Sequence, residues 1–229
     1  YELQGSFGID SLTLSERPEP QPGAGQVLLK MRAWSLNYRD LMVVKGTYHP
    51  HLRLPFTPLS DGVGEVVAVG EGVSRVKTGD RVAGIFMQKW IDGQLTEVKA
   101  NSALGGARAG LAAEYVVLDA EGVVPIPEHL TDEEGATLPC AAVTAAHALI
   151  YAGNIQAGDT VLIQGPGQQG LSQTVACKQA GASLIIITGT NKDKARLDVA
   201  LKLGADLSHD PWPPLRPPAD HHRCGAGLA

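Results

Sequence analysis

The stretch Thr160-Val-Leu-Ile-Gln-Gly-Pro-Gly-Gln-Gln-Gly170 decides how the second half of this chain is expected to fold. A short apolar run, Val161 to Ile163, leads into the spacing Gly165-x-Gly167-x-x-Gly170, and residues 171–180 then predict a helix. In such a strand–turn–helix unit one glycine permits the tight turn, one lets the backbone approach a pyrophosphate, and one allows close helix–strand packing. The pattern predicts a phosphate-binding turn at a helix N-terminus. The alternative is a structural turn without a nucleotide.

The composition restricts the classes of protein to which this chain can belong. The chain has 229 residues, of which 44% are hydrophobic and 19% charged, as in ordinary soluble globular domains. The net charge of -5 gives no basic surface for nucleic acid or membrane, and no apolar run has the ~20 residues that a membrane span needs. Three widely spaced cysteines fit a reducing compartment, and we expect a cytoplasmic protein without a signal peptide. Since the chain begins at Tyr1 without a methionine, a few N-terminal residues are expected to be missing.

Two domains and a tail are predicted. Residues 1–125 carry short strands broken by Gly, Pro and Asp, which predict a small β-barrel, whereas residues 91–110 are expected to be a surface loop. The predicted strands are Gln26–Trp34, Gly62–Gly70, Arg81–Phe86 and Ala113–Leu118. Residues 126–209 predict the first half of a doubly wound parallel sheet. Residues 210–229 hold five of the 15 prolines and are expected to be disordered.

Local signals in residues 126–209 set the predicted helices. Thr131 and Glu134 form a capping box that begins a helix, which restarts after Pro139 and reaches residue 149. A second strand, residues 183–188, follows the glycine turn and its helix. Asn191 is predicted to cap a last helix, which ends at Gly204.

This order of motifs resembles the medium-chain dehydrogenase/reductase superfamily, and in particular its zinc-independent, quinone-oxidoreductase-like branch. The resemblance covers residues 1–209 and depends on these segments: Leu36–Leu41, Asp61–Gly70, Lys77–Val82, Ala113–Val117, Ala136–Ala145 and Val161–Gly165. It implies a GroES-like barrel followed by a Rossmann domain. It also implies hydride transfer between a nicotinamide and a carbonyl, enone or quinone.

The resemblance also implies which residues form the site. Zinc-dependent relatives have a cysteine and a His-Glu pair at the positions that hold Asn37 and Ser60-Asp61 here, so no metal site is expected. Asn37 and Tyr38 are expected near the nicotinamide, and Tyr48 is a candidate donor to a substrate carbonyl. The alternatives are a turn-capping asparagine and a surface tyrosine. The residues predicted to bind the cofactor are Asn37, Thr144, Gly165, Gly167, Gln168, Gln169, Gly170, Thr188, Gly189, Thr190, Lys194 and Arg196.

The end of the second predicted strand bears on the choice of cofactor. NAD-dependent folds place an acidic residue there for the ribose hydroxyls, whereas this chain has Gly189. Lys192, Lys194 and Arg196 follow closely, which favours NADP. Two alternatives stay open: Asp193 could reach the ribose, which would favour NAD, or the cations are a solvated helix start.

The predicted Rossmann domain is incomplete, since the pattern stops after its second βα unit. We therefore expect a C-terminally truncated chain. The alternative function is a catalytically incompetent fragment that binds the adenosine half of the cofactor or associates with full-length subunits. The expected partners are a small-molecule substrate and no nucleic acid or membrane, and full-length relatives are expected to form homo-oligomers.

Overall fold

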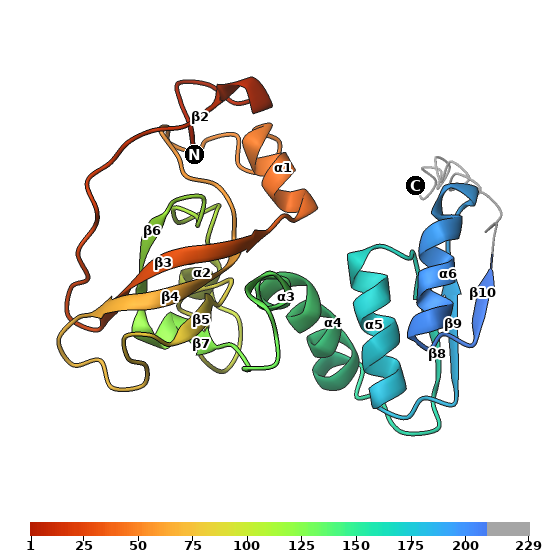
Figure 1. The fold of residues 1–229 in the computed structure, drawn as a ribbon. Coiled ribbons are helices and arrows are strands. Elements are labelled where there is room, and N and C mark those ends of the chain that lie inside the picture. The colour runs from red at the N-terminus through yellow and green to blue at the C-terminus, as the bar shows by residue number, and fades with distance from the viewer. Residues whose placement is uncertain (210–229) are drawn as a thin grey trace, which may run out of the picture. The chain divides into compact units, whose positions relative to one another are not determined.

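The computed structural model describes residues 1–209, which divide into two compact units. The first unit is Tyr1–Val143 and the second begins at Thr144. Figure 1 shows the elements of each unit, coloured from red at the N-terminus to blue. The disorder predicted for residues 210–229 lies outside the described residues.

The first unit is built on a five-stranded antiparallel sheet with the order β6-β3-β4-β5-β7 (Figure 1). The four predicted strands are present with small shifts of their ends, and β7 was not predicted. The strands are β3 (Gln26–Ser35), β4 (Asp61–Val69), β5 (Arg81–Gly84), β6 (Tyr115–Asp119) and β7 (Val123–Pro125). A separate pair, β1 (Glu2–Leu3) and β2 (Leu12–Thr13), lies near the N-terminus.

Apolar side chains of this sheet form the main core of the first unit. Val27, Leu29, Val66, Val82 and Leu118 are buried together, because alternate residues of paired strands face the same side. Strands β3 and β4 approach closely at Gly62: a Cβ there would lie 2.7 Å from the Met31 Cε atom and 3.0 Å from the Ala33 carbonyl oxygen.

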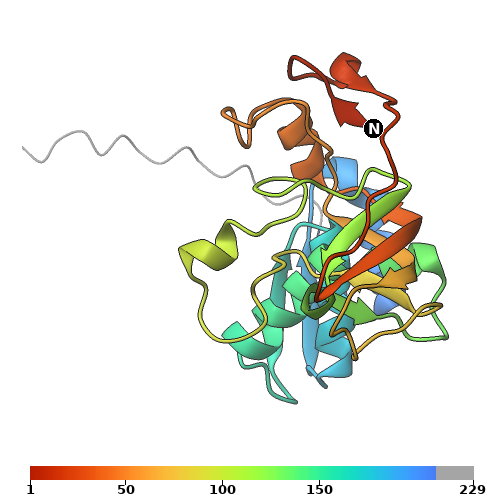
Figure 2. The same cartoon turned by 90° about the vertical axis from the view of Figure 1, so that its left-hand side faces the viewer.

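The helices of the first unit are short. They are α1 (Tyr38–Val44), α2 (Glu97–Ala100) and α3 (Asp132–Ala136), with single 3₁₀ turns at Ile9–Ser11 (η1) and Ala120–Gly122 (η2). In Figure 2 the yellow-green segment with α2 stands away from the sheet. The predicted surface loop 91–110 is wrong for residues 102–106, which are buried, because Leu104 packs into the core.

The segment after the barrel begins with the predicted capping box. The Glu134 N–H donates to Thr131 Oγ1 (3.2 Å), and the Thr131 N–H donates to Glu134 Oε2 (2.9 Å). The chain continues through the π-helical segment Leu138–Ala142 (η3), α4 (Val143–Ala146) and the π-helical segment His147–Ala152 (η4). The compact units therefore divide after Val143 rather than near residue 125, because Ala136 of α3 is buried against the sheet.

The second unit contains a three-stranded parallel sheet with the order β10-β9-β8. Figure 1 shows α5 and α6 against this sheet, as the βαβ connections require. The elements are β8 (Thr160–Gln164), α5 (Gln168–Gln179), β9 (Leu184–Thr188), η5 (Asn191–Asp193), α6 (Lys194–Leu203) and β10 (Leu207–His209). The fold class predicted from the sequence, a GroES-like barrel followed by a partial Rossmann unit, is confirmed.

Two helix starts differ from the prediction. Helix α5 begins at Gln168 rather than residue 171, because Gly167 is its N-cap. Thr190 rather than Asn191 caps the next turn, because Thr190 forms a capping box with Asp193. Helix α6 ends as predicted at Gly204, whose φ of 115° lies in the left-handed region that favours glycine.

A compact apolar core holds the second unit together. Ile163, Ile185, Ile187, Leu197 and Cys177 are buried in it. Burial raises the pKa of the Cys177 thiol above its usual range, so this cysteine stays protonated at neutral pH. Within residues 1–209, every helix is too short or too polar to span a lipid bilayer.

Candidate functional site

The glycine turn connects β8 to the N-terminus of α5. Gly165 has a φ of 96°, which a side chain would strain. A Cβ at Gly170 would overlap the Gly165 carbonyl oxygen, so only glycine lets the first turn of α5 pack on the strand end. At Gly167 a Cβ would meet no atom within 4 Å, so the space beside this backbone is open. The three glycines thus have the three different roles that a phosphate-binding turn needs.

The first residues of α5 provide the donors of this turn. Helix α5 has 12 residues, and Gln168 and Gln169 occupy its first two positions. The first N–H groups of a helix have no acceptor within the helix and attract anions. A dinucleotide pyrophosphate therefore fits this turn.

The structure brings the end of β9 next to the glycine turn. The Gly165 N–H donates to the Thr188 carbonyl oxygen (2.8 Å), and a Cβ at Gly189 would lie 3.3 Å from the Pro166 Cδ atom. Thr188 is buried, with Oγ1 3.5 Å from the Ile163 carbonyl oxygen, so its side chain is turned into the unit. Thr190 is exposed.

Asp193 is held by its own helix start. Its Oδ2 atom accepts hydrogen bonds from the Thr190 hydroxyl (2.7 Å) and the Thr190 N–H (3.0 Å). These hydrogen bonds lower the pKa of the Asp193 carboxyl, and Arg196 at 3.5 Å adds a smaller effect. Lys194 is exposed and forms no ion pair within the described part of the chain. The carboxylate that offered the NAD alternative is thus engaged in capping, while Lys194 is available.

In the first unit, Asn37 lies at the N-cap of α1 and Tyr38 at its first position. Tyr38 is 78% exposed. Tyr48 is 44% exposed, and its ring centroid lies 4.9 Å from the Arg39 guanidinium carbon and 4.9 Å from the His49 ring. Thr144, the remaining predicted residue, is exposed on α4 in the second unit.

Sequence reasoning missed a buried polar cluster around Asn37. Asp61 is fully buried, and its carboxylate accepts hydrogen bonds from the Ser60 hydroxyl (2.9 Å) and the Cys140 N–H (3.0 Å). The Asp40 carboxylate is buried on α1 and accepts from the Asn37 N–H (2.8 Å). The signal that could have found Asp40 is its position, three residues after an N-cap asparagine.

Burial dominates the electrostatics of this cluster. It raises the pKa of both the Asp61 and Asp40 carboxyls, and hydrogen bonds and Arg39 offset only part of the rise. The Asn37 side chain lowers the pKa of Asp61, but its Nδ2 atom has no partner in good hydrogen-bond geometry among residues 1–209. Nδ2 of Asn37 and Oδ1 of Asp40 are thus buried atoms that make no hydrogen bond of good geometry among residues 1–209, although Asp61 and the Ser60 backbone respectively interact with these side chains.

The polar cluster does not fit zinc. Zinc sites in proteins are tetrahedral and use thiolate, imidazole or carboxylate ligands. Asn37 and Ser60 offer an amide and a hydroxyl, and both oxygens of Asp61 already accept hydrogen bonds. Among residues 1–209, no group of three His, Cys, Asp or Glu side chains lies close enough to hold a metal ion.

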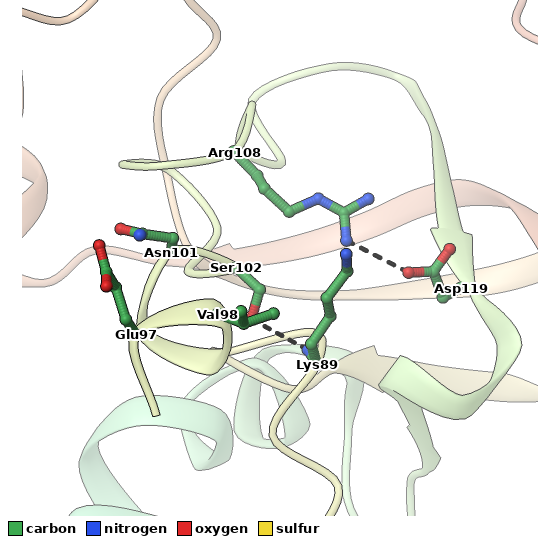
Figure 3. A pocket seen from close by; sticks show the side chains of 7 residues that line it. All are labelled: Lys89, Glu97, Val98, Asn101, Ser102, Arg108 and Asp119. Atoms are coloured by element: carbon green, nitrogen blue, oxygen red, sulfur yellow. Dashed lines mark hydrogen bonds and ion pairs between the residues drawn. The ribbon is translucent and has the colours of Figure 1, made fainter. Parts of the chain in front are cut away.

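A separate pocket of about 700 Å³ lies between the α2 segment and β6. Figure 3 shows Lys89 pointing toward Arg108, which forms an ion pair with Asp119 at 3.2 Å. Its lining includes two basic residues, Lys89 and Arg108, and two acidic ones, Glu97 and Asp119. It contains none of the predicted site residues, so its size alone does not make it the functional site.

The fold and the glycine turn define a protein with a GroES-like barrel and a dinucleotide-binding type of unit. The family model of the alcohol dehydrogenase GroES-like domain matches residues 23–128. A zinc-type alcohol dehydrogenase-like protein of Schizosaccharomyces pombe is 43% identical over 201 residues, which are 86% of this chain and 57% of that protein. The chain thus carries an alcohol dehydrogenase GroES-like domain and is similar over most of its length to alcohol dehydrogenases and quinone oxidoreductase-like proteins, as its motifs predicted.

Solved structures agree with this assignment. An NAD-dependent alcohol dehydrogenase is 31% identical with a TM-score of 0.80, covering 91% of this chain and 62% of that one. A mycobacterial protein solved as a complex with NADPH is 29% identical with a TM-score of 0.69, covering 91% of this chain and 56% of that one. The chain thus spans somewhat more than half the length of the relatives it matches.

Proposed function

We propose that this chain is part of a zinc-independent oxidoreductase that binds NADPH and reduces a carbonyl, enone or quinone. The observation that carries the proposal is the glycine turn, where a Cβ at Gly167 would meet no atom within 4 Å. The residue after the neighbouring strand is Gly189 rather than an acidic residue, and the adjacent Asp193, 3.1 Å from a Cβ built there, is engaged by Thr190. The nicotinamide supplies the hydride when it is bound. The names of the relatives, dehydrogenases for the most part, support the reaction class.

NADP is favoured over NAD by the charges after β9. A carboxylate at position 189 would repel a 2′-phosphate, and this chain has glycine there. Asp193 is engaged by Thr190, whereas Lys194 and Arg196 bring positive charge to the same helix start. One relative is described as NAD-dependent and another as a complex with NADPH, so both cofactors occur among similar proteins.

The substrate side of the proposal assigns Asn37 as the residue that holds a carboxamide or substrate oxygen. This role is supported by the Nδ2 atom of Asn37, which makes no hydrogen bond of good geometry among residues 1–209 and only a weaker interaction with Asp61. Tyr48 is proposed as a donor to the substrate carbonyl, and Tyr38 and Thr144 as residues beside the cofactor. Zinc independence is supported by the poor fit of Asn37 and Ser60 to a metal.

A second candidate is a chain that binds only the adenosine half of the cofactor. It is supported by the sheet of the second unit, in which β8 has a neighbour on one side alone among residues 1–209. A complete doubly wound sheet has a second half beyond that edge, where the nicotinamide lies.

Measurements of cofactor binding and of catalytic turnover with the same protein distinguish the two candidate functions. We expect NADPH to bind at least tenfold more tightly than NADH, a difference of about 1.4 kcal/mol. The full proposal is supported if the protein still reduces a quinone or enone after dialysis against a zinc chelator. Binding of 2′-phospho-AMP as tightly as NADPH, without turnover, favours the second candidate. Equal affinity for NADH and NADPH contradicts the cofactor choice.

A further inference from the structure

A second, smaller pocket of the first unit has a basic lining. It has a volume of about 420 Å³ and lies between the loop after α1 and residues 106–107. Its ionisable lining residues are His49, His51 and Arg53, and no acidic residue lines it. Leu52 and Phe56 add apolar surface. This differs from the pocket of Figure 3, where basic and acidic residues offset each other.

Arg39 adjoins this pocket from α1. A Cβ at Gly106, a lining residue, would overlap the Arg39 Nη2 atom and would lie 3.5 Å from the His49 Cδ2 atom. Arg39, His49 and Gly106 therefore meet at one wall of the pocket. No side chain at position 106 separates the guanidinium from the pocket.

The Arg39 guanidinium is held in place by neutral groups. Its carbon lies 4.9 Å from the centroid of the Tyr48 ring and 4.7 Å from that of the Phe86 ring. Its Nη1 atom donates to the Leu104 carbonyl oxygen at 3.1 Å. Aromatic faces attract a guanidinium and fix its plane, so the remaining N–H groups have a defined direction.

The charge of Arg39 is not neutralised by a direct partner. Within residues 1–209 no carboxylate lies at ion-pair distance from it. Its Nε atom is buried without an acceptor, and its Nη2 atom makes no hydrogen bond but is not buried. Asp40 and Asp61 feel Arg39 only as a minor influence on their pKa values. Partly buried cations are normally paired, so an anionic partner is missing from this set of residues.

We propose that this pocket binds a small organic anion, with the oxyanion of a carboxylate or phosphate monoester held by Arg39 and Arg53. The Nη2 group of Arg39 is not buried and makes no hydrogen bond among residues 1–209, so its N–H groups can donate to such an oxyanion. Leu52 and Phe56 contact the carbon part of the ligand. The proposal concerns binding alone and is independent of the oxidoreductase activity.

Calorimetric titration of the protein, without a nicotinamide cofactor, tests the pocket. The probes are inorganic phosphate, acetate and butyrate. We expect saturable binding at millimolar concentration, with butyrate tighter than acetate because of the apolar lining. Competition between phosphate and butyrate then shows which oxyanion the pocket prefers. Absence of saturable binding for all three probes overturns the proposal.

Substitutions of the arginines test whether the anion binds in this pocket. Arg53→Gln is expected to weaken it about fivefold and Arg39→Lys about tenfold, since a lysine lacks the planar fork. Arg75→Gln is the matched control, because Arg75 pairs with Glu121 away from the pocket. Arg53 is a surface residue, so its variant remains informative if the Arg39 variant fails to fold. Equal affinity in the Arg53 and Arg75 variants overturns the assignment of the anion to this pocket.

Discussion

The glycine turn of the second unit and the polar cluster of the first unit are built in opposite ways. The turn comes from six consecutive residues, Gly165 to Gly170, and both Gly165 and Gly170 have a local backbone reason to be glycine. The cluster joins Asn37, Asp61 and Cys140, which come from the N-cap of α1, the start of β4 and η3. A motif that is contiguous in sequence therefore specifies its own geometry, whereas a cluster of distant residues depends on the sheet that brings them together.

The largest expected effect is that of a substitution in the glycine turn, and it tests whether the turn depends on its own backbone geometry. In Gly170→Ala the new methyl group overlaps the Gly165 carbonyl oxygen, and backbone cannot yield as a flexible side chain can. We expect a loss of about 3 kcal/mol in the free energy of unfolding, at the upper end of overpacking effects. Urea unfolding measures it.

Gly167→Ala is the matched control for this substitution. Its Cβ meets no atom within 4 Å, so the free energy of unfolding should change by less than about 1 kcal/mol. The methyl group would stand where the pyrophosphate approaches, and NADPH affinity should fall at least tenfold, about 1.4 kcal/mol. Similar unfolding energies for the two variants would show that the glycines do not have separate roles.

The second prediction tests the distant cluster. Asp61→Ala leaves the Ser60 hydroxyl and the Cys140 N–H without their acceptor in a buried place. Each buried unsatisfied donor costs about 1–3 kcal/mol, so we expect a loss of about 3 kcal/mol. Asp61→Asn keeps an acceptor for Cys140 and should lose less than half as much. If both variants have the same free energy of unfolding, the hydrogen bond from the Cys140 N–H does not account for the loss of stability.

The third prediction concerns cofactor choice in the second unit. Lys194→Ala and Arg196→Ala each remove a positive charge at the start of α6 and should weaken NADPH binding about fivefold, with NADH binding unchanged. Lys202→Ala, which removes a charge from the last turn of the same helix, is the control. Fluorescence titration with both cofactors measures the ratio. An equal loss for NADH would mean that these cations do not recognise the 2′-phosphate.

The smallest expected effect concerns the pH dependence of the cluster. Burial raises the folded-state pKa of Asp40 above its ordinary value of 3.8. The stability that this group contributes is then fully present below the unfolded pKa and is lost as the pH rises through the folded pKa. Asp40→Asn should therefore stabilise the protein at pH 7 by about 1 kcal/mol, a common size for one substitution.

This gain should shrink as the pH falls through the folded-state pKa of Asp40, where the wild-type carboxyl becomes neutral as well. Urea unfolding of both proteins at a series of pH values from neutral to acid checks the direction. A gain that stays constant over this range, or a loss at pH 7, would contradict the assigned cause.

The sequence by itself determined the two kinds of fold, the glycine turn and the family, because hydrophobic period and glycine spacing act over short distances along the chain. It also placed the helix stop at Gly204 and the capping box at Thr131. It misplaced the start of α5 and the buried residues near Leu104, since both depend on contacts beyond the local pattern.

Only the tertiary structure decided which polar groups meet. In the sequence, Asp61 and Asp40 look like ordinary acidic residues. Their burial near Asn37 follows from the fold, which brings η3 to the first residue of β4 and places Asp40 in the first turn of α1. The unpaired guanidinium of Arg39 beside Gly106 is likewise a product of the fold. The physical reason is that desolvation and hydrogen-bond satisfaction belong to three-dimensional surroundings, which no single stretch of sequence contains.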